Sequence, residues 1–369
     1  MNILHVCKKY PQAMGGDAVV VSHLQKHQRA AGHHVAIVTT NCKEIIDAPY
    51  VYKYGIKDTP ANLDAITLRR VISLLILFFR SFAIIRQERP QVIHTHSIDM
   101  AFFVSFAARF YGVPIVHTFH IVTFYDADQS VIRRKAELWM ARRAKLHIMT
   151  APNTHDVEQL QAAGMMDAVV MPNGVDAAFW QADGPHVPND MYTFLTVGRL
   201  EPQKGYEYLI KATALLRAGL SKQFRVIIVG EGSQKETLKK CIDELHLQNI
   251  ISLVGRKSPE EIRTLLGRAD AAVFSSLYET TPITMLEAWS VAVPVIVTKV
   301  GLVRDAPTDF NAAYIVPPKD EHSLMHAMRS VATDAKLSAT MALKGQKEAQ
   351  KYSWPHIAQL AQALYRSTD

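Results

Sequence analysis

The most informative stretch of the sequence is SLYETTPITMLEA, residues 276–288, which joins a short apolar run to a helical pattern. We expect Thr281 to cap the helix and Pro282 to be its first residue, because the N–H that proline lacks is not needed there. Such a helix end carries free N–H groups and a partial positive charge, which attract phosphate. Glu279 would lie in the preceding loop and Glu287 about two turns inside the helix. The stretch therefore fits either a nucleotide-sugar site, with hydroxyl groups at the two carboxylates, or an ordinary capped helix with solvated acids.

Strand and helix patterns alternate on both sides of this stretch. Short apolar or β-branched runs are separated by longer amphipathic segments, which is typical of βαβ units in a parallel sheet covered on both faces. The expected strands are Ile3–Val6, His34–Thr39, Val92–His96, Ile115–Thr118, Leu146–Thr150, Phe194–Val197, Arg225–Val229, Ile250–Val254, Ala271–Phe274 and Val295–Thr298. The expected helices include Asp17–Ala31 and one that opens with a capping box at residues 258–261. The fold class predicted is α/β, with two doubly wound domains.

A segment rich in proline, glycine and aspartate, residues 183–190, separates the two halves. We therefore expect a Rossmann-like domain over residues 1–184 and a second one over residues 185–350, joined by a hinge. Ligands of doubly wound sheets bind at the carboxyl ends of the strands. With two such domains, the cleft between them is the default location of the site.

Composition narrows the class of protein. The chain has 369 residues, of which 49% are hydrophobic and 20% charged, as is usual for a soluble globular protein. Cys7, Cys42 and Cys241 have neither disulfide nor metal spacing, which fits a reducing cytosol. The first residues predict a strand and not a signal peptide, so we expect a cytoplasmic location. A net charge of +7 permits anionic partners, but we expect no nucleic acid among them.

The segment 69–86 is unusually apolar and carries arginines at both ends. It is too short and too charged to span a bilayer, which needs ~20 mainly apolar residues. It predicts either a helix partly buried in the core or a basic amphipathic helix that lies in an anionic membrane surface. Peripheral contact with the inner face of the cytoplasmic membrane is therefore one expectation.

Cationic side chains flank the loop after the first strand of the second half, where Arg199 and Lys204 lie five residues apart. Arginine offers a planar fork for phosphate oxygens and lysine a mobile charge, a natural pair for a diphosphate. The alternative is two solvated loop cations, but α/β sheets bind phosphates at this position.

Glycines occur where several strands end. Gly15 and Gly16 follow the first strand and open a helix, so the backbone could approach an anion closely. Gly230 and Arg256 follow two strands of the second half. Each of these positions is a candidate ligand contact or simply a tight turn.

Four histidines lie on or just after two expected strands: His94, His96, His117 and His120. With neither cysteine nor carboxylate at ligand spacing beside them, they do not predict a zinc site. His120, at the carboxyl end of a strand, is better placed to contact a substrate. Asp126 and Asp128 match a D-x-D pattern, but so short a pattern is common by chance, and we expect no metal.

Taken together, these motifs resemble the GT-B fold retaining glycosyltransferases of family 4, also called group 1. The resemblance covers essentially the whole chain. The motifs that carry it, in chain order, are Gly15-Gly16, Val92–His96, Val116–His120, Pro172–Asp176, Gly198-Arg199 with Lys204-Gly205, the Glu279/Glu287 pair, and Tyr352-Ser353-Trp354.

The resemblance implies a role for each site residue. The catalytic residues would be Glu279, close to the transferred sugar, and His120, in contact with its hydroxyl groups. The donor-binding residues would be Gly16, Arg199, Lys204, Gly230, Arg256, Thr281, Ile283, Thr284 and Glu287. In that set, Arg199 and Lys204 would hold the diphosphate, Glu287 the ribose hydroxyls, and the Gly16 amide the distal phosphate. Residues 351–369 would form a helix that packs back on the N-terminal domain.

The activity implied is retaining transfer, without metal or other cofactor, of a hexose-type sugar from a nucleoside-diphosphate donor. A UDP-sugar is expected rather than a GDP-sugar, and the acceptor would be a polysaccharide or a lipid-linked saccharide. The alternatives are a sugar phosphorylase, a nucleotide-sugar epimerase, or a non-catalytic assembly subunit that binds nucleotide-sugar. Two departures bear on this choice: Thr280-Thr281-Pro282 replaces the usual Gly-Phe-Gly, and Arg304 stands where an acid is common.

Overall fold

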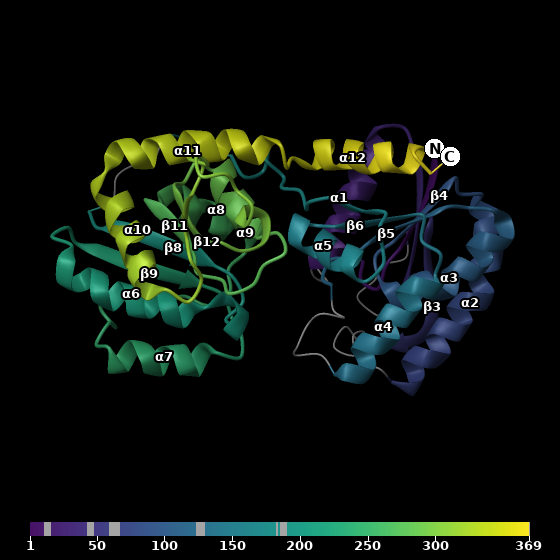
Figure 1. Cartoon of the computed structure of the whole chain (residues 1–369), viewed down its shortest axis with the longest axis horizontal. Helices are drawn as coiled ribbons and strands as arrows, with labels where there is room; N and C mark the ends of the chain where they lie inside the picture. The colour runs from purple at the N-terminus through teal and green to yellow at the C-terminus, as the bar shows by residue number, and fades with distance from the viewer. Residues whose placement is uncertain are drawn as a thin grey trace. The chain divides into compact units, whose positions relative to one another are not determined.

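The chain forms two compact units in the computed structural model (Figure 1). The structure describes residues 1–10, 16–42, 48–58, 67–122, 130–181, 184 and 190–368. One unit combines Met1–Asn173 with Trp354–Asp369, and the other is Gly174–Ser353. The second unit begins before the expected boundary at 184, because Val175 pairs with Ser353 and Trp180 packs in the core of that unit.

The first unit contains a seven-stranded parallel sheet in the order β3-β2-β1-β4-β5-β6-β7. Its strands are β1 Asn2–Val6, β2 His34–Cys42, β3 Val51–Asp58, β4 Val92–Thr95, β5 Ile115–Thr118, β6 Ile148–Ala151 and β7 Ala168–Val170. All of its expected strands are present, while β3 and β7 were not predicted. The sheet order reverses beside β1, between β2 and β4, which is the switch point where such sheets place ligands.

Helices cover this sheet, and one of them comes from the far end of the chain. They are α1 Gly16–Ala30, α2 Leu68–Glu88, α3 Ile98–Tyr111, α4 Val131–Arg143, α5 Thr154–Ala162 and α12 Trp354–Arg366. Figure 1 shows α12, in yellow, beside α1, in purple. Trp354 is buried and its ring stacks on His23 of α1, with ring centroids 4.8 Å apart. The C-terminal helix therefore belongs to the first unit.

The second unit repeats the plan with six parallel strands in the order β10-β9-β8-β11-β12-β13. The strands are β8 Tyr192–Val197, β9 Phe224–Val229, β10 Ile251–Leu253, β11 Ala271–Phe274, β12 Val295–Thr298 and β13 Tyr314–Val316. The helices are α6 Tyr206–Gly219, α7 Lys235–Glu244, α8 Pro259–Arg268, α9 Ile283–Ser290, α10 Glu321–Thr333 and α11 Ala335–Gln350, with short 3-10 turns at Pro202–Lys204 and Gly301–Val303. The reversal lies beside β8, between β9 and β11.

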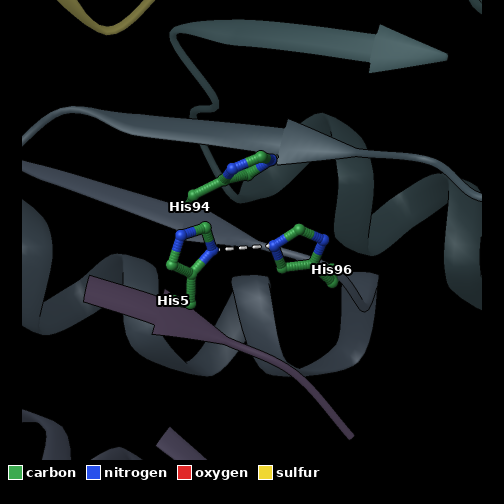
Figure 2. Close-up of side chains that lie close together, drawn as sticks. All are labelled: His5, His94 and His96. Carbon is green, nitrogen blue, oxygen red and sulfur yellow. Dashed lines mark hydrogen bonds between the residues drawn. The ribbon is translucent and has the colours of Figure 1, made fainter. Parts of the chain in front are cut away.

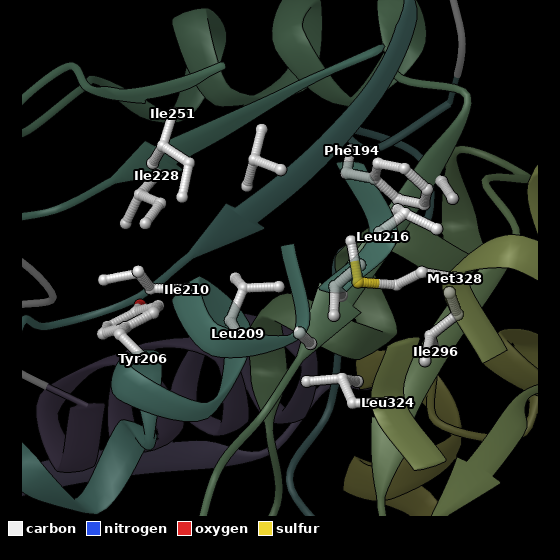
Figure 3. Close-up of a cluster of buried hydrophobic side chains, with 14 of the residues drawn as sticks. Phe194, Tyr206, Leu209, Ile210, Leu216, Ile228, Ile251, Ile296, Leu324 and Met328 are labelled. Carbon is white, nitrogen blue, oxygen red and sulfur yellow. The ribbon is translucent and has the colours of Figure 1, made fainter. Parts of the chain in front are cut away.

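The core of the second unit explains its strand sequences (Figure 3). Phe194 of β8, Ile228 of β9 and Ile296 of β12 are buried with Leu216 of α6 and Met328 of α10. Both faces of the sheet are covered, so strands read as continuous apolar runs and not as alternating ones. The predicted capping box is also present, with Ser258 and Glu261 bonding each other's backbone N–H at the start of α8. The predicted α/β fold with two doubly wound domains is confirmed.

Helix α2 is half-buried, which confirms the expected partial burial of the segment 69–86 in the core; contact with a membrane stays a prediction. Its inner face carries Leu74, Leu77, Ile84 and Ile85 into the core. Its outer face leaves apolar side chains in solvent, among them Phe79, which is 71% exposed. No helix in the described part of the chain is long and apolar enough to cross a membrane.

A buried ion pair attaches the start of α2 to α3. The Arg70 guanidinium donates to the carboxylate of Asp99 at 2.8 Å and to the Tyr54 hydroxyl at 3.0 Å. Lys8, after β1, lies 3.4 Å from the same carboxylate. Asp99 thus joins the end of β1 to two helices of the first unit.

We expect Asp99→Asn to destabilise the protein by about 2–4 kcal/mol, because Arg70 would be left buried without its counter-charge. Chemical denaturation of the purified variant measures this. The control is Glu244→Gln, which breaks an exposed pair with Lys240 and should cost below about 0.5 kcal/mol. Equal losses in the two variants would contradict a structural role for Asp99.

Candidate functional site

Two loops interlock at the carboxyl edge of the second sheet, one after β8 and one after β11. The Leu277 N–H donates to the Gln203 carbonyl at 2.8 Å, and the Gln203 side chain donates to the Tyr278 carbonyl at 2.9 Å. The Ser275 hydroxyl donates to the Lys204 carbonyl at 3.0 Å. These strands are neighbours at the point where the sheet order reverses, so the loops meet where such sheets bind ligands.

Lys204 and Glu279 form an ion pair across these loops. The Lys204 ammonium bonds Glu279 Oε1, and the Ser276 hydroxyl donates to the same oxygen at 2.7 Å. Glu279 is only 9% exposed, so its charge needs these partners. The structure thus brings together a residue predicted to hold the diphosphate and one predicted to lie near the sugar. Ser276 and Gln203 support both residues and were not among the predicted site residues.

Gly230 has a structural reason to be glycine. Its φ is +150°, and a Cβ there would lie 1.9 Å from the Gly198 carbonyl oxygen. Its N–H donates to the Gly255 carbonyl at 2.9 Å. Gly230 therefore packs the end of β9 against the loop that carries Arg199. Its predicted contact with a donor stays a prediction.

The start of α9 differs from the prediction. The helix begins at Ile283, with Pro282 as the N-cap residue, and no side chain caps it. The expected cap at Thr281 is wrong, because the carbonyl of Pro282 and not that of Thr281 accepts the first helical bonds, from Met285 and Leu286. Thr281 is instead buried, and its hydroxyl oxygen has no hydrogen-bond partner in the described chain.

This arrangement leaves groups for a ligand at the start of α9. Ile283 and Thr284 are the first two residues of the helix, so their N–H groups have no carbonyl one turn earlier to bond. The positive end of the helix dipole adds to their attraction for an anion. Both predicted donor-binding residues are thus placed where backbone N–H groups can meet a phosphate.

Glu287 lies about one turn inside α9, not two. It is half-buried, and its carboxyl group makes no hydrogen bond or ion pair with any described residue. Burial raises the pKa of Glu287 to about 8. A carboxyl group held in this way can exchange hydrogen bonds with the hydroxyls of a ligand.

Arg199 and Arg256 follow β8 and β10 on the same edge of the sheet, and both are exposed. Neither forms an ion pair in the described part of the chain. Two unpaired arginines, Lys204 and the start of α9 give this edge a cationic character that suits a nucleoside diphosphate.

In the first unit, the predicted residues Gly16 and His120 lie at the carboxyl edge of the seven-stranded sheet. Gly16 is the first residue of α1, which follows β1, and His120 follows β5. His120 Nε2 is 3.1 Å from His96 Nδ1. The aspartates of the D-x-D pattern, Asp126 and Asp128, lie outside the described residues.

His96 belongs to a cluster that sequence reasoning found only in part. His5, His94 and His96 offer nitrogen atoms within 4.8 Å of one another, close enough to raise the question of a metal (Figure 2). In Figure 2 the rings of His5 and His96 point at each other, and His5 Nδ1 is 3.0 Å from His96 Nε2.

Each of the six ring nitrogens in this cluster already has a hydrogen-bond partner. His94 bonds the Tyr365 hydroxyl and Thr118, each at 2.7 Å. His5 bonds the Gln28 side chain at 2.8 Å through its second nitrogen. The donor set therefore fits a satisfied hydrogen-bonded network better than a metal centre, which needs lone pairs that converge on one point.

Two doubly wound units, each with a parallel sheet, define a protein of the GT-B class. Residues 181–348 match the family described as glycosyl transferases group 1, and residues 14–179 match glycosyltransferase family 4. The chain belongs to these group 1 and family 4 glycosyltransferases.

Individual relatives agree with this assignment. The chain is 27% identical over 399 residues to glycogen synthase of Mycobacterium tuberculosis strain H37Rv, covering 99% of this chain and 94% of that protein. It is 26% identical over 383 residues to a GDP-mannose:cellobiosyl-diphosphopolyprenol alpha-mannosyltransferase of Xanthomonas oryzae, covering 97% and 94%. Among solved structures, sucrose-phosphate synthase of Thermosynechococcus elongatus matches with a TM-score of 0.81 at 19% identity, covering 100% and 99% of the two chains.

We expect the stability of Glu287→Gln to differ from wild type in a pH-dependent way. The pKa of Glu287 is raised from 4.5 to about 8 on folding, so its contribution to stability is present below pH 4.5 and is lost as the pH rises towards 8. The glutamine variant does not titrate. As the pH rises from 5 to 9, the free energy of unfolding of the variant should therefore increase by about 2 kcal/mol relative to that of the wild type.

Thermal unfolding at a series of pH values measures this effect. Glu236→Gln, at an exposed position of α7, is the matched control and should follow the wild-type profile. A difference between Glu287→Gln and wild type that is constant from pH 5 to pH 9 would contradict the burial of this carboxyl group.

Proposed function

We propose that this chain transfers a hexose-type sugar from a nucleoside-diphosphate donor to a polysaccharide or a lipid-linked saccharide. The observation that carries the proposal is the Lys204–Glu279 pair, held at the switch point of the sheet and followed directly by the uncapped start of α9. A cation and free N–H groups suit a diphosphate, and carboxyl groups suit sugar hydroxyls. The glycogen synthase and mannosyltransferase relatives support the two acceptor classes.

The donor contacts follow from chemistry and position. Arg199 and Lys204 hold the diphosphate together with the N–H groups of Ile283 and Thr284, and Glu287 bonds the ribose hydroxyls. The strand-end residues Gly230 and Arg256 lie beside the base, for which we propose uracil. The buried Thr281 hydroxyl, which has no partner among the described residues, donates a hydrogen bond to the nucleotide-sugar or accepts one from it.

Transfer proceeds without a metal ion in this proposal. The bond from the sugar to the diphosphate breaks, and negative charge develops on the leaving nucleoside diphosphate. Lys204, Arg199 and the start of α9 are arranged to stabilise that charge. The acceptor oxygen attacks from the side on which the diphosphate leaves, so the configuration is retained, and a phosphate oxygen takes the acceptor's proton. In this arrangement Glu279 lies close to the transferred sugar, where a carboxyl group suits the sugar hydroxyls.

Two residues of the first unit also act on the donor in this proposal. His120 contacts hydroxyl groups of the transferred sugar, and the Gly16 amide contacts the distal phosphate. Gly16 suits this role because it opens α1, where N–H groups are free.

We expect Lys204→Ala to weaken binding of the nucleoside diphosphate by at least tenfold, because a charge-assisted hydrogen bond is worth about 1.5–3 kcal/mol. Calorimetric titration with UDP, and with GDP and ADP for comparison, measures this. Lys240→Ala, at an exposed position of α7, is the control and should bind as wild type.

The double variant Lys204→Ala/Glu279→Gln separates two causes of weaker binding. Removing Lys204 alone leaves the Glu279 carboxylate unpaired, and this charge would itself repel a phosphate. If the double variant recovers wild-type affinity, Lys204 serves only to neutralise Glu279, and its donor role is contradicted.

Product analysis distinguishes transfer from the alternative activities. Release of nucleoside diphosphate that requires a saccharide acceptor, with the anomeric configuration kept, supports the proposal. Phosphate-dependent turnover indicates a phosphorylase, and epimerised nucleotide-sugar without any acceptor indicates an epimerase. Binding without turnover in the presence of acceptors indicates a non-catalytic subunit.

We also propose that the first unit contacts an anionic membrane, at the inner face of the cytoplasmic membrane. The contact surface is the α2–α4 apolar surface, formed by exposed apolar side chains of three helices: Leu68, Val71, Ile72, Leu75, Phe79, Phe106, Phe110, Tyr111, Val131, Ile132 and Trp139. Aromatic contacts join these helices, with ring centroids 5.5 Å apart for Phe78 and Phe106 and 5.2 Å apart for Phe102 and Trp139.

The charges around this surface favour anionic lipid. Exposed basic residues on the same helices are Arg69, Arg80, Arg86, Arg109, Lys135, Arg142 and Arg143. Each of these helices has one acidic residue, and none of the three is a free surface charge. Glu88 is buried. Asp99 pairs with Arg70, and Glu137 pairs with Arg133. An apolar face flanked by cations is typical of proteins that bind the headgroup region of anionic membranes.

We expect the protein to co-sediment with vesicles that contain phosphatidylglycerol, and less with pure phosphatidylcholine or at high salt. Phe79→Ser/Phe110→Ser should reduce binding at least fivefold, because two exposed rings leave the lipid. Leu343→Ser, at an exposed position of α11 in the second unit, is the matched control. If the wild-type protein co-sediments with neither type of vesicle, the proposed membrane contact of the α2–α4 apolar surface is contradicted.

A further inference from the structure

A chain of hydrogen bonds leads from the C-terminal helix through the sheet to His120. It begins at Tyr365 of α12, whose hydroxyl accepts from Gln28 Nε2 of α1 at 3.1 Å. Gln28 Oε1 is 2.8 Å from His5 Nε2 on β1, and His5 Nδ1 is 3.0 Å from His96 Nε2 (Figure 2). His96 Nδ1 then reaches His120 Nε2 at 3.1 Å. All of these groups lie in the first unit.

The three imidazoles in this series of hydrogen bonds, those of His5, His96 and His120, are neutral. Burial lowers the pKa of His5 to about 4 and the pKa of His96 well below its usual value. Burial also lowers the pKa of His120, although the negative charge of Asp17 opposes the shift. A neutral imidazole has one nitrogen that donates and one that accepts, so each ring must donate on one side of the chain and accept on the other.

With the Gln28 amide nitrogen facing Tyr365, as the hydrogen-bond geometry places it in this structure, one direction follows for every other bond. Because its nitrogen donates to Tyr365, its oxygen faces His5 and must accept, so His5 Nε2 carries the proton. His5 Nδ1 therefore accepts, and the proton between the next two rings belongs to His96 Nε2. By the same step His96 Nδ1 accepts from His120, which leaves His120 Nδ1 without a proton.

The branch through His94 obeys the same direction. The Tyr365 hydroxyl accepts from Gln28, so it gives its own proton to His94 Nδ1 at 2.7 Å. His94, neutral because burial lowers its pKa, then donates from Nε2 to the Thr118 hydroxyl, which is also hydrogen-bonded to the Thr150 hydroxyl at 2.7 Å. One arrangement of protons is thus consistent with both branches, and it leaves His120 Nδ1 as an acceptor at the end of the first branch.

We propose that Gln28 is a positioning residue that sets the tautomer of His120. It acts through His5 and His96 and holds the His120 ring with Nε2 protonated and Nδ1 free to accept. This inference rests on the proposed function, in which His120 contacts hydroxyl groups of the transferred sugar. His120 Nδ1 then accepts a hydrogen bond from a sugar hydroxyl and does not offer it an N–H.

The tautomer can be read directly from nitrogen chemical shifts. We expect two-bond 1H–15N spectra of the full-length protein with 15N-labelled histidine to show His120 in the Nε2–H form, assigned with His120→Asn. In Gln28→Met the direction is no longer imposed, and both tautomers should appear. Gln25→Met is the matched control: this glutamine is also buried on α1 and bonds Tyr10, away from the chain.

Activity is measured separately, so that the two proposals can fail independently. If the protein is a transferase, Gln28→Met should lower kcat about three- to tenfold, the value of one hydrogen bond, with little change in KM for the donor. Tyr365→Phe, which removes only the hydroxyl, should have the same effect on tautomer and kcat. If His120 is in the Nε2–H form but the protein has no transferase activity, the role of Gln28 in setting the tautomer is supported and the proposed sugar transfer is contradicted.

Three results would overturn the proposal. The first is an Nδ1–H tautomer of His120 in the wild-type protein. The second is an unchanged tautomer in folded Gln28→Met and Tyr365→Phe. The third is displacement of the His5, His94 and His96 N–H signals by stoichiometric Zn²⁺, which would show a metal site in place of the hydrogen-bonded chain.

Discussion

All the strand pairs described in both sheets are parallel, and this constraint decides where chemistry can occur. Parallel strands end at a common edge, and the sheet order reverses once in each unit, beside the first strand of that unit. The loops after β8 and β11 are therefore brought side by side, although Lys204 and Glu279 are 75 residues apart in the chain. In the first unit the same constraint gathers the ends of β1, β4 and β5, and with them His96 and His120.

The two glutamates of the stretch 276–288 illustrate how the same side chain can serve two purposes. Glu279 is buried but neutralised by Lys204 and bonded by Ser276, so it also joins two loops. Glu287 has no such partner and carries the penalty of its burial as a raised pKa. The contacts of Glu279 with Lys204 and Ser276 give that carboxylate a structural role, whereas no contact in the described chain explains the carboxyl group of Glu287. The second is therefore the stronger sign of a ligand.

Sequence patterns predicted the elements that are buried and uniform, and failed where tertiary packing decides. β5, β11 and β12 were predicted to the residue, because fully covered parallel strands are short apolar runs. β3 was missed because its lysines and glycine break that pattern, and β13 because three residues give too little of it. The expected Thr281 cap failed because this side chain is buried, whereas a local rule assumes that it turns back over the helix. The hydrogen bond between Gln28 and Tyr365 could not be predicted from a sequence pattern, because 337 residues separate the two.

The replacement of glycines by Thr280-Thr281-Pro282 bears on specificity through backbone geometry. Proline fixes φ at this position, here −71°, and removes an N–H that could meet a phosphate. The segment is also held from behind: Gly301 has φ +56°, and a Cβ there would lie 2.7 Å from the Glu279 carbonyl oxygen and 2.9 Å from that of Thr280. The backbone of Gly301 therefore packs closely against this segment. The Thr281 hydroxyl, buried without a partner, is the group left to replace the missing N–H, and a hydroxyl can donate or accept where a backbone N–H can only donate. In the proposed donor site, this replacement would offer a phosphate or sugar a hydroxyl in place of a backbone N–H, while the Lys204–Glu279 ion pair is present in the structure.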